Sequence, residues 1–379
     1  MKQIYFDSAA TTQVRDKVID IMAAVLRENY GNASSSHGFG RSSKSVIELA
    51  RKNIAKHLNI SASEIVFTSG GTEADNLVLR SCVRDLGVKN IITSRIEHHA
   101  VLHTAEKLAK EYGTNISYVD LDKKGGIDLS HLEKLLHSSE NALVSLMHVN
   151  NEIGNLLDIK TVANLCKENN ALFHSDTVQS VGHFELDLKE IPIDFLAVSA
   201  HKFHGPKGVG FAFIRKNSGI KPLIIGGEQE RGLRAGTESL HNIIGLEESL
   251  SIAYKNLNKE HKYILGLKQY FMDRLNKEFQ NIKYNGYSNN IENSTYTIIN
   301  VRFPVDSNKS STFLFQLDLK GIACSEGSAC QSGSSKGSHV LEQILTEDEL
   351  KMPSIRFSFS KYNTKEEVDN VVEVLKQLV

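Results

Sequence analysis

The feature of this sequence that most constrains the fold is a regular alternation of short apolar runs with longer amphipathic stretches. The apolar runs recur between about residues 65 and 214, as EIVFTS, NIITS, NISYVD, NALVSLMHV, ALFHSD, DFLAVSA and VGFAFIR. Stretches with helical periodicity lie between them, at 72–86, 99–112, 130–138 and 159–169. Because parallel strands need long crossover connections, this rhythm predicts an α/β domain with a mostly parallel sheet sandwiched by helices.

The pattern changes after this region, which indicates a second, smaller domain. A long amphipathic stretch at 239–280 predicts one or two helices, and the strand-like run TYTIINVRF follows it. The runs FLFQLDLKGIAC and SIRFSFS, with a closing helix at 364–378, favour a small α+β unit. We therefore expect a large domain over 12–256 and a small domain formed by 1–11 and 257–379.

Composition excludes several classes of partner. The 44 basic and 45 acidic residues nearly cancel and no long block of like charge occurs, so we expect no nucleic acid or anionic membrane as a partner, and a small ligand instead. The start MKQIYFDSAATT lacks the features of a secretory signal, and no apolar run approaches the length of a membrane span. These observations favour a cytoplasmic protein.

The four cysteines, at 82, 166, 324 and 330, are too few and too dispersed for a disulfide framework or a zinc ribbon. A single reactive thiol fits their distribution better. Cys330 lies in CSEGSACQSGSS, whose small and polar residues suit a mobile loop reaching solvent, at about 324–336. Cys324 ends an apolar stretch and is expected to pack, and an inert loop thiol is the alternative for Cys330.

Two segments predict an anion site and a nucleophilic amine. SGGTEADN follows the run EIVFT and opens a helix, so its free backbone N–H groups and the positive helix end favour an anion, although a glycine-rich turn capped by Thr72 is the alternative. SAHKFHGPKGVG places Ser199, His201 and Lys202 at the end of a strand, where ligands gather in parallel sheets. Lys202 is therefore a Schiff-base candidate, and a solvated loop lysine is the alternative. The spacing does not match a Walker P-loop.

Three further segments carry candidate site residues. In HSDTVQSVG, Asp176 could pair with a protonated ring nitrogen or cap a helix, and Gln179 could donate to a ring oxygen. In RIEHHAVLH, His98 could stack on a planar cofactor, whereas His99 and His103 have metal-ligand spacing without a complete zinc signature. Arg356, in IRFSFS, could clamp a carboxylate or pair at the surface.

The order of motifs resembles one enzyme family over nearly the whole chain. The motifs are YFDSAATT, SGGTEADN, IEHHAV, MHVNNEIG, HSDTVQSVG, SAHKFHGPKGVG, ERGLRAGT, EGSACQSG and IRFSFS. They resemble the group I cysteine desulfurases of the class V aminotransferase superfamily, similar to the nitrogen-fixation and housekeeping iron–sulfur enzymes. The resemblance implies a fold-type I enzyme dependent on pyridoxal 5'-phosphate, with no metal in the site.

The resemblance also implies roles for individual residues. Lys202 would bind the cofactor, His98 would stack on its ring, and Asp176 and Gln179 would contact the ring nitrogen and oxygen. The phosphate would be held by Gly71, Thr72, Ser199, His201 and, from the other subunit of a homodimer, Thr237. Asn151 and Arg356 would hold the carboxylate of L-cysteine. Cys330 would take the sulfur as a persulfide while L-alanine forms, with Lys202 and His98 as proton carriers.

The implied product is sulfur for iron–sulfur cluster assembly or another sulfur transfer, delivered to an acceptor such as an iron–sulfur scaffold protein. Glu326 stands where the family often has Ser, and a carboxylate so close would disfavour the Cys330 thiolate and slow its attack. The additional Cys324 would permit persulfide transfer or a disulfide. No longer C-terminal tail follows VVEVLKQLV, so we expect weak docking of such a scaffold. The alternatives are a selenocysteine lyase or another class V activity, which would not need Cys330. An inactive homologue and a metal hydrolase are further alternatives.

Overall fold

The largest sheet of the protein has seven strands, and each of the seven apolar runs contributes one. A computed structural model describes residues 3–327 and 337–379. The strands are β2 (Ile65–Thr68), β3 (Asn90–Thr93), β4 (Asn115–Tyr118), β5 (Ala142–Ser145), β6 (Leu172–Asp176), β7 (Phe195–Ser199) and β8 (Gly210–Ile214). Their order is β2-β8-β7-β6-β5-β3-β4, and β8 runs in the opposite direction to the other six strands. The predicted α/β fold with a mostly parallel sheet is confirmed.

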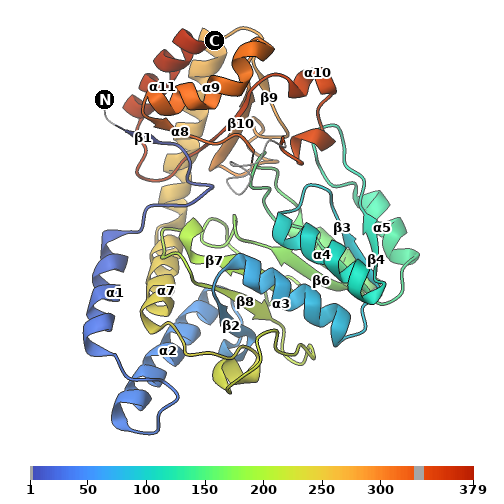
Figure 1. The fold of residues 1–379 in the computed structure, drawn as a ribbon, viewed down its shortest axis with the longest axis vertical. Helices are drawn as coiled ribbons and strands as arrows, with labels where there is room; N and C mark the ends of the chain where they lie inside the picture. The colour runs from blue at the N-terminus through green and yellow to red at the C-terminus, as the bar shows by residue number, and fades with distance from the viewer. Residues whose placement is uncertain (1–2, 328–336) are drawn as a thin grey trace.

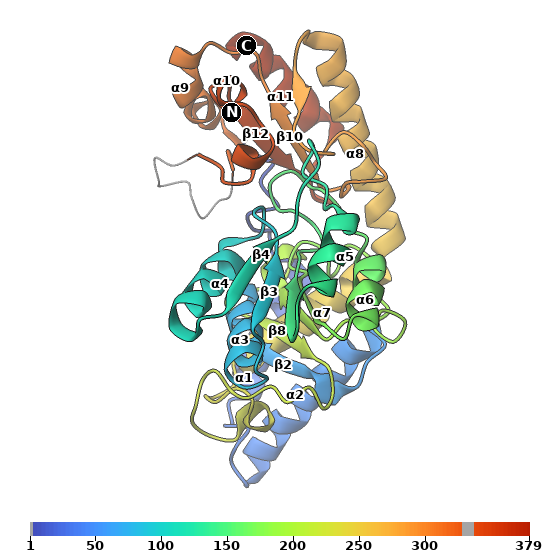
Figure 2. The same ribbon diagram turned by 90° about the vertical axis from the view of Figure 1, so that its right-hand side faces the viewer.

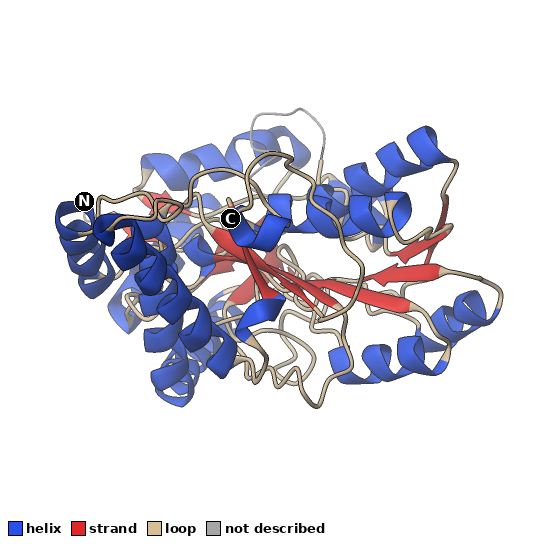
Figure 3. Ribbon diagram, turned by 90° about the horizontal axis from the view of Figure 1, so that it is seen from below, coloured by secondary structure: helices blue, strands red, loops and turns tan. Residues whose placement is uncertain are grey.

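Helices cover both faces of this sheet, as Figure 3 shows. Alternation along the strands explains the two layers: Phe195 and Ala197 of β7 pack on one face, and Leu196 and Val198 pack on the other. The first face carries α3 (Gly71–Arg84) and α4 (His99–Tyr112). The second face carries α2 (Gly38–His57), α5 (Leu129–His137), α6 (Ile159–Glu168) and α7 (Leu240–Lys255).

The predicted helices between the strands correspond to α3, α4, α5 and α6, with bounds that differ by two residues at most. The predicted stretch 239–280 is two helices, α7 and α8 (Leu257–Glu278). Helix α1 (Asp16–Glu28) packs along α7. The proposed domain boundary at residue 256 falls between α7 and α8 and remains a prediction.

Helix α8 runs from the large sheet to the part of the molecule that lies at the top of Figure 1. That part has a hydrophobic core of its own. A three-stranded sheet there consists of β9 (Lys283–Tyr284), β10 (Ile298–Arg302) and β12 (Ser354–Ser358), and β1 (Ile4–Tyr5) pairs in parallel with β11 (Ile322–Ala323). The helices are α9 (Ser307–Leu319), which contains FLFQLDL, α10 (Glu347–Leu350) and α11 (Lys365–Leu378). Both termini lie in this part (Figures 1 and 2). Within the described ranges, no helix combines the length and apolarity that crossing a bilayer requires.

Candidate active site

A cavity of about 450 Å³ lies where β6 and β7 end and where α3 and α4 begin. This is the edge at which parallel sheets bind ligands. Ten of the residues singled out from the sequence line it: Gly71, Thr72, His98, Asn151, Asp176, Gln179, Ser199, His201, Lys202 and Arg356. Segments as distant as β6 and β12 therefore meet in one cavity, as the motifs predicted.

The start of α3 forms a cradle suited to an anion. Gly70, with φ 152°, is the N-cap and makes no side-chain cap hydrogen bond, so the alternative in which Thr72 caps this helix is wrong. A Cβ on Gly71 would lie 2.5 Å from Val178 Cγ2, which explains why glycine is required there. The first N–H groups of α3 thus face the cavity edge together with Ser199.

Lys202 lies in the short turn that follows β7, and its ammonium group is already bound by backbone. Lys202 Nζ donates to the carbonyl oxygens of Ala9, at 2.6 Å, and Ala10, at 2.9 Å. The side chain is therefore held inside the cavity, so the alternative of a freely solvated loop lysine does not fit this geometry. Lys207 is exposed and precedes Gly208, whose φ of 78° marks a turn.

Two histidines next to Lys202 are neutral at physiological pH. Burial, and then the positive charge of Lys202, lower the pKa of His98 to about 4. The same two causes lower the pKa of His201 to about 4. His98 is the N-cap of α4, where its Nδ1 accepts from Ala100 N at 3.1 Å, so its ring orientation is fixed. A neutral ring can stack on an aromatic cofactor or accept a proton.

Asp176 ends β6 and points into the cavity with its carboxylate largely buried. Burial raises its pKa to about 6, against the opposing effects of the Val178 N–H and the charge of Lys202. Its Oδ1 accepts from Val178 N at 2.9 Å, in a turn rather than at the start of a helix. Gln179 donates to Ala9 O at 2.9 Å, which ties this turn to the N-terminal segment.

Asp75 is a cavity residue that sequence reasoning missed. It is fully buried on α3, one turn after Gly71, and its Oδ1 lies 3.3 Å from His174 Nε2. Burial, and then the charges of Asp176 and Glu97, raise its pKa well above its usual range. The i, i+4 spacing from the anion cradle was the available signal, since it places Asp75 on the same helix face.

Asp7 is a second missed residue, and it fixes Arg356. The buried guanidinium donates to Asp7 Oδ1 and to the Asn151 carbonyl oxygen, both at 2.8 Å. Asn151 therefore meets Arg356 through its backbone. The Arg356 backbone also pairs with Ser325 in an isolated bridge, two residues after β11. The acid in YFDSAATT was the only sequence signal for Asp7, and its partner lies 349 residues away.

The cysteines divide as expected in the described ranges. Cys82 and Cys166 are buried, and Cys324 packs against the hydrophobic core that includes β10 and β12. Burial, and then the carboxylate of Asp7, raise the pKa of the Cys324 thiol against the opposing charge of Arg356, so it stays protonated. Glu326 is exposed, and Cys330 lies outside the described residues.

Two further candidates lie away from this cavity. Thr237 is exposed and lines a neighbouring cavity of about 140 Å³ together with Ser69 and Arg234, so it does not line the cofactor cavity of its own chain. His99 stacks on His103 with ring centroids 4.5 Å apart, and the ring of His339 lies tilted against it at 4.4 Å. Among the residues that the structure describes, no group of side chains could hold a metal ion.

This fold, with a lysine and a buried acid at the ends of adjacent parallel strands, defines a class of enzyme. The family model of class-V aminotransferases matches residues 4–371, and the chain belongs to this family. Its cofactor is pyridoxal 5'-phosphate, and the cavity fits that group, with an anion cradle, a buried acid and a lysine around one space.

Individual relatives indicate the activity more specifically than the family match does. The chain is 41% identical to the cysteine desulfurase IscS of Dictyoglomus turgidum, over 100% of this chain and 95% of that protein. It is 40% identical to the cysteine desulfurase IscS of Clostridium botulinum, over 100% and 94%. A solved NifS-like protein superposes with a TM-score of 0.90 at 36% identity, covering 99% of both chains. SspA in complex with cysteine superposes with a TM-score of 0.82 at 31% identity, over 96% and 100%.

Proposed function

We propose that the protein is a cysteine desulfurase that converts L-cysteine to L-alanine and transfers the sulfur to Cys330. The observation that carries this proposal is the meeting of Lys202, Asp176 and Arg356 in one cavity. These side chains supply an attachment point for the cofactor, a partner for its ring and a clamp for a carboxylate. The names of the full-length relatives support the same activity.

The residues of the large sheet would hold the cofactor. The start of α3, with Gly71 and Thr72, and the side chains of Ser199 and His201 suit the phosphate. Asp176 suits the ring nitrogen, because a carboxylate there keeps that nitrogen protonated, and His98 suits the ring face. When bound, pyridoxal phosphate supplies an electron sink for the negative charge that develops at the substrate Cα.

Arg356 would orient the substrate through its carboxylate. Its guanidinium is held by Asp7 and by the Asn151 carbonyl, and its Nε has no hydrogen-bond partner within the described ranges. A guanidinium fixed in this way is preorganised, so little side-chain entropy is lost when a carboxylate binds. The complex of SspA with cysteine, at 31% identity, supports a cysteine-sized ligand for this cavity.

Lys202 and His98 are the proton carriers. The Lys202 amine would take the Cα proton, and the neutral His98 ring would accept or return a proton at the reacting atoms. The Cys330 thiolate then attacks the substrate sulfur. An Sγ–S bond forms as the Cβ–S bond of the substrate breaks, and protons delivered to the remaining carbon skeleton complete alanine.

We also propose a homodimer in which Thr237 reaches the phosphate site of the other subunit. Thr237 is exposed beside the cofactor cavity of its own chain without lining it. The protein also exposes large apolar side chains. Ile225 is 84% exposed, and the exposed rings of Tyr30 and Phe39 pack on each other with centroids 5.4 Å apart. Exposed apolar groups of this size are typical of a protein interface.

The proposed sulfur acceptor is a protein thiol, such as that of an iron–sulfur scaffold, which would attack the outer sulfur of the persulfide. The proposed location is the cytoplasm, where thiols remain reduced and Cys330 stays available. Both proposals follow from the chemistry of a persulfide.

One experiment tests the activity directly. Purified protein is mixed with L-cysteine, and alanine, sulfide and the mass of the peptide that contains Cys330 are measured. The proposal predicts stoichiometric alanine and a mass increase of one sulfur on Cys330. Alanine without any sulfur on Cys330, or pyruvate in place of alanine, would contradict it.

A further inference from the structure

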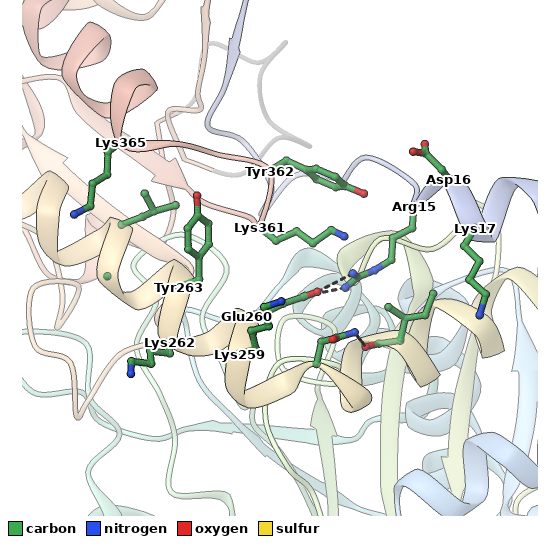
Figure 4. A pocket seen from close by; sticks show the side chains of 14 residues that line it. Arg15, Asp16, Lys17, Lys259, Glu260, Lys262, Tyr263, Lys361, Tyr362 and Lys365 are labelled. Carbon is green, nitrogen blue, oxygen red and sulfur yellow. Dashed lines mark hydrogen bonds and ion pairs between the residues drawn. The ribbon is translucent and has the colours of Figure 1, made fainter.

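A second and larger cavity, of about 1000 Å³, lies on the other side of the N-terminal segment from the cofactor cavity. Its walls are the start of α1, the outer face of α8 and the segment 361–365 that follows β12 (Figure 4). We call it the α8 groove. It shares no lining residue with the cofactor cavity, and a space of only about 20 Å³ lies between them, bordered by both Lys202 and Glu260.

The charge of the α8 groove differs from that of the protein. The chain carries a net charge of −1, whereas the groove is lined by six basic and two acidic residues: Arg15, Lys17, Lys259, Lys262, Lys361, Lys365, Asp16 and Glu260. An excess of four positive charges in one concave surface creates a local positive potential, which attracts anions whatever the net charge of the protein.

Part of this charge is used within the protein. Arg15 makes a two-pronged ion pair with Glu260, with both N···O distances at 2.8 Å, and Lys17 pairs with Glu248. The first pair joins the start of α1 to α8, and the second joins α1 to α7. In Figure 4, the Arg15–Glu260 pair lies beside Lys361.

Four lysines remain for a ligand. Lys259, Lys262, Lys361 and Lys365 line the groove and make no ion pair with any described residue. Lys361 and Lys365 lie over the rings of Tyr362 and Tyr270, with Nζ 4.6 and 4.9 Å from the ring centroids, which leaves their charge uncompensated by a carboxylate. Burial, and then the charge of Arg15, lower the pKa of Lys361, against the opposing charges of Glu260 and Asp16. Because the four come from α8 and from 361–365, an anion must be extended to reach them all.

Two tyrosines add an aromatic surface between these lysines. Tyr263 and Tyr362 are 45% and 38% exposed, and both line the groove. The Tyr263 hydroxyl donates to Asn363 O at 2.7 Å, which holds its ring in place. Fixed, exposed aromatic rings bordered by charge are typical of surfaces that bind protein segments.

We propose that the α8 groove docks an extended acidic segment of a partner protein, with carboxylates on the four lysines and the segment lying across the two tyrosines. The volume of the groove fits several residues and exceeds the need of a single small anion. Its concave shape argues against a lipid surface, since its lysines line walls and could not all reach a flat layer of head groups. This proposal is independent of the proposed desulfurase activity.

The test uses the intact holoenzyme and a fluorescein-labelled peptide of repeating Glu-Ala units. One variant combines Lys259→Gln, Lys262→Gln, Lys361→Gln and Lys365→Gln. The matched control combines Lys110→Gln, Lys123→Gln, Lys167→Gln and Lys277→Gln, which removes the same charge from exposed lysines outside the groove. Fluorescence anisotropy measures binding at low and at moderate salt, and the cofactor absorption band shows that each variant is folded.

The groove variant should bind the peptide roughly 10- to 100-fold more weakly than the parent, because several exposed ion pairs are lost together. The peptide affinity of the control should stay within about threefold of that of the parent. Added salt should weaken peptide binding by the parent and the control, and should have little effect on the groove variant. Equal losses in both variants, or no measurable binding by the parent, would overturn the proposal. Binding of inorganic polyphosphate or phosphatidylserine vesicles at the groove in preference to the peptide would also overturn it. So would a groove-dependent self-association seen by sedimentation.

Discussion

The two sides of the cofactor cavity are built in different ways. On one side, Asp176 ends β6 and Lys202 lies in the turn after the neighbouring strand β7, and each lies in a continuous motif of the chain. On the other side, Arg356 depends on Asp7 from the opposite end of the chain. The first side can hold a cofactor without the second. We therefore expect cofactor binding and turnover to be separable by mutation.

Lys202→Ala should have the largest effect, because it removes the covalent attachment of the cofactor and a proton carrier at once. We expect turnover to fall by roughly 10⁴-fold or more. Borohydride should fix the cofactor to Lys202 in the parent and to no residue in the variant, as peptide mass spectrometry can show. Lys216→Ala, at an exposed lysine after β8, is the control. A normal visible band in Lys202→Ala without added amine would refute the assignment.

Cys330→Ala should separate the two sides of the cavity most clearly. The variant should retain the cofactor and its spectral response to L-cysteine, while alanine formation falls by about 10²-fold or more, since the sulfur-accepting step is removed. Stopped-flow absorbance and alanine analysis measure the two properties. Cys324→Ala should be mild, because that thiol is packed and protonated. If the two variants behave the other way round, the nucleophile is Cys324.

The cofactor side was easier to predict from sequence than the substrate side, for a physical reason. Strand ends carry their side chains to one edge of a parallel sheet, so Lys202 and Asp176 could be placed together from local pattern alone. Asp7 and Asp75 were missed because their roles depend on tertiary contacts, with Arg356 and with His174. The helical spacing of Asp75 indicates its face of α3 but not its partner. The charge of the α8 groove was likewise hidden, since its lysines come from separate segments.

Asp176→Ala should leave substrate binding largely intact and slow loss of the Cα proton by ~10²-fold, because an electrostatic partner of the ring is removed. Asp128→Ala is the matched control, since Asp128 is a true N-cap that accepts from Ser130 N and His131 N. That control should lose about 1 kcal/mol of stability and no activity. Exchange of the substrate Cα proton with solvent measures the rate at which that proton is lost. Similar behaviour of the two variants would assign Asp176 to a structural role.

Arg356→Gln should affect the substrate side alone. We expect KM for L-cysteine to rise about 10- to 100-fold, since a charge-assisted hydrogen bond to a carboxylate is lost, while the cofactor spectrum stays unchanged. Steady-state kinetics measures KM, and absorbance spectroscopy measures the cofactor spectrum. Arg302→Gln is a control from the same sheet, where Arg302 pairs with Glu349 outside the cavity. An unchanged KM together with reduced stability would show that Arg356 serves only to bind Asp7.

Lys268 tests the junction between the two sides, and its substitution should have the smallest effect. This lysine is fully buried on α8, where its Nζ donates to Ser294 Oγ at 2.9 Å and to Thr295 O at 2.7 Å. Thr295 N in turn donates to the Gly154 carbonyl at 2.8 Å, three residues after Asn151. Burial lowers the pKa of Lys268 from 10.5 to about 7.

The depressed pKa of Lys268 determines how the free energy of unfolding changes with pH. Below about pH 7 the Lys268 amine is protonated in both the folded and the unfolded chain, so the folded state is destabilised by the full cost of burying the charge. Between pH 7 and 10.5 the unfolded chain keeps the proton that the folded chain has lost, and stability therefore rises with pH.

Relative to Lys268→Met, the parent should gain free energy of unfolding from pH 7 to 9, at no more than about 1.4 kcal/mol per pH unit. Urea unfolding at fixed protein and cofactor concentration measures this difference, with Lys277→Met on the same helix as the exposed control. Parallel pH profiles for the parent and Lys268→Met would mean that Lys268 keeps its proton, and that its two hydrogen bonds hold a charged group at the junction.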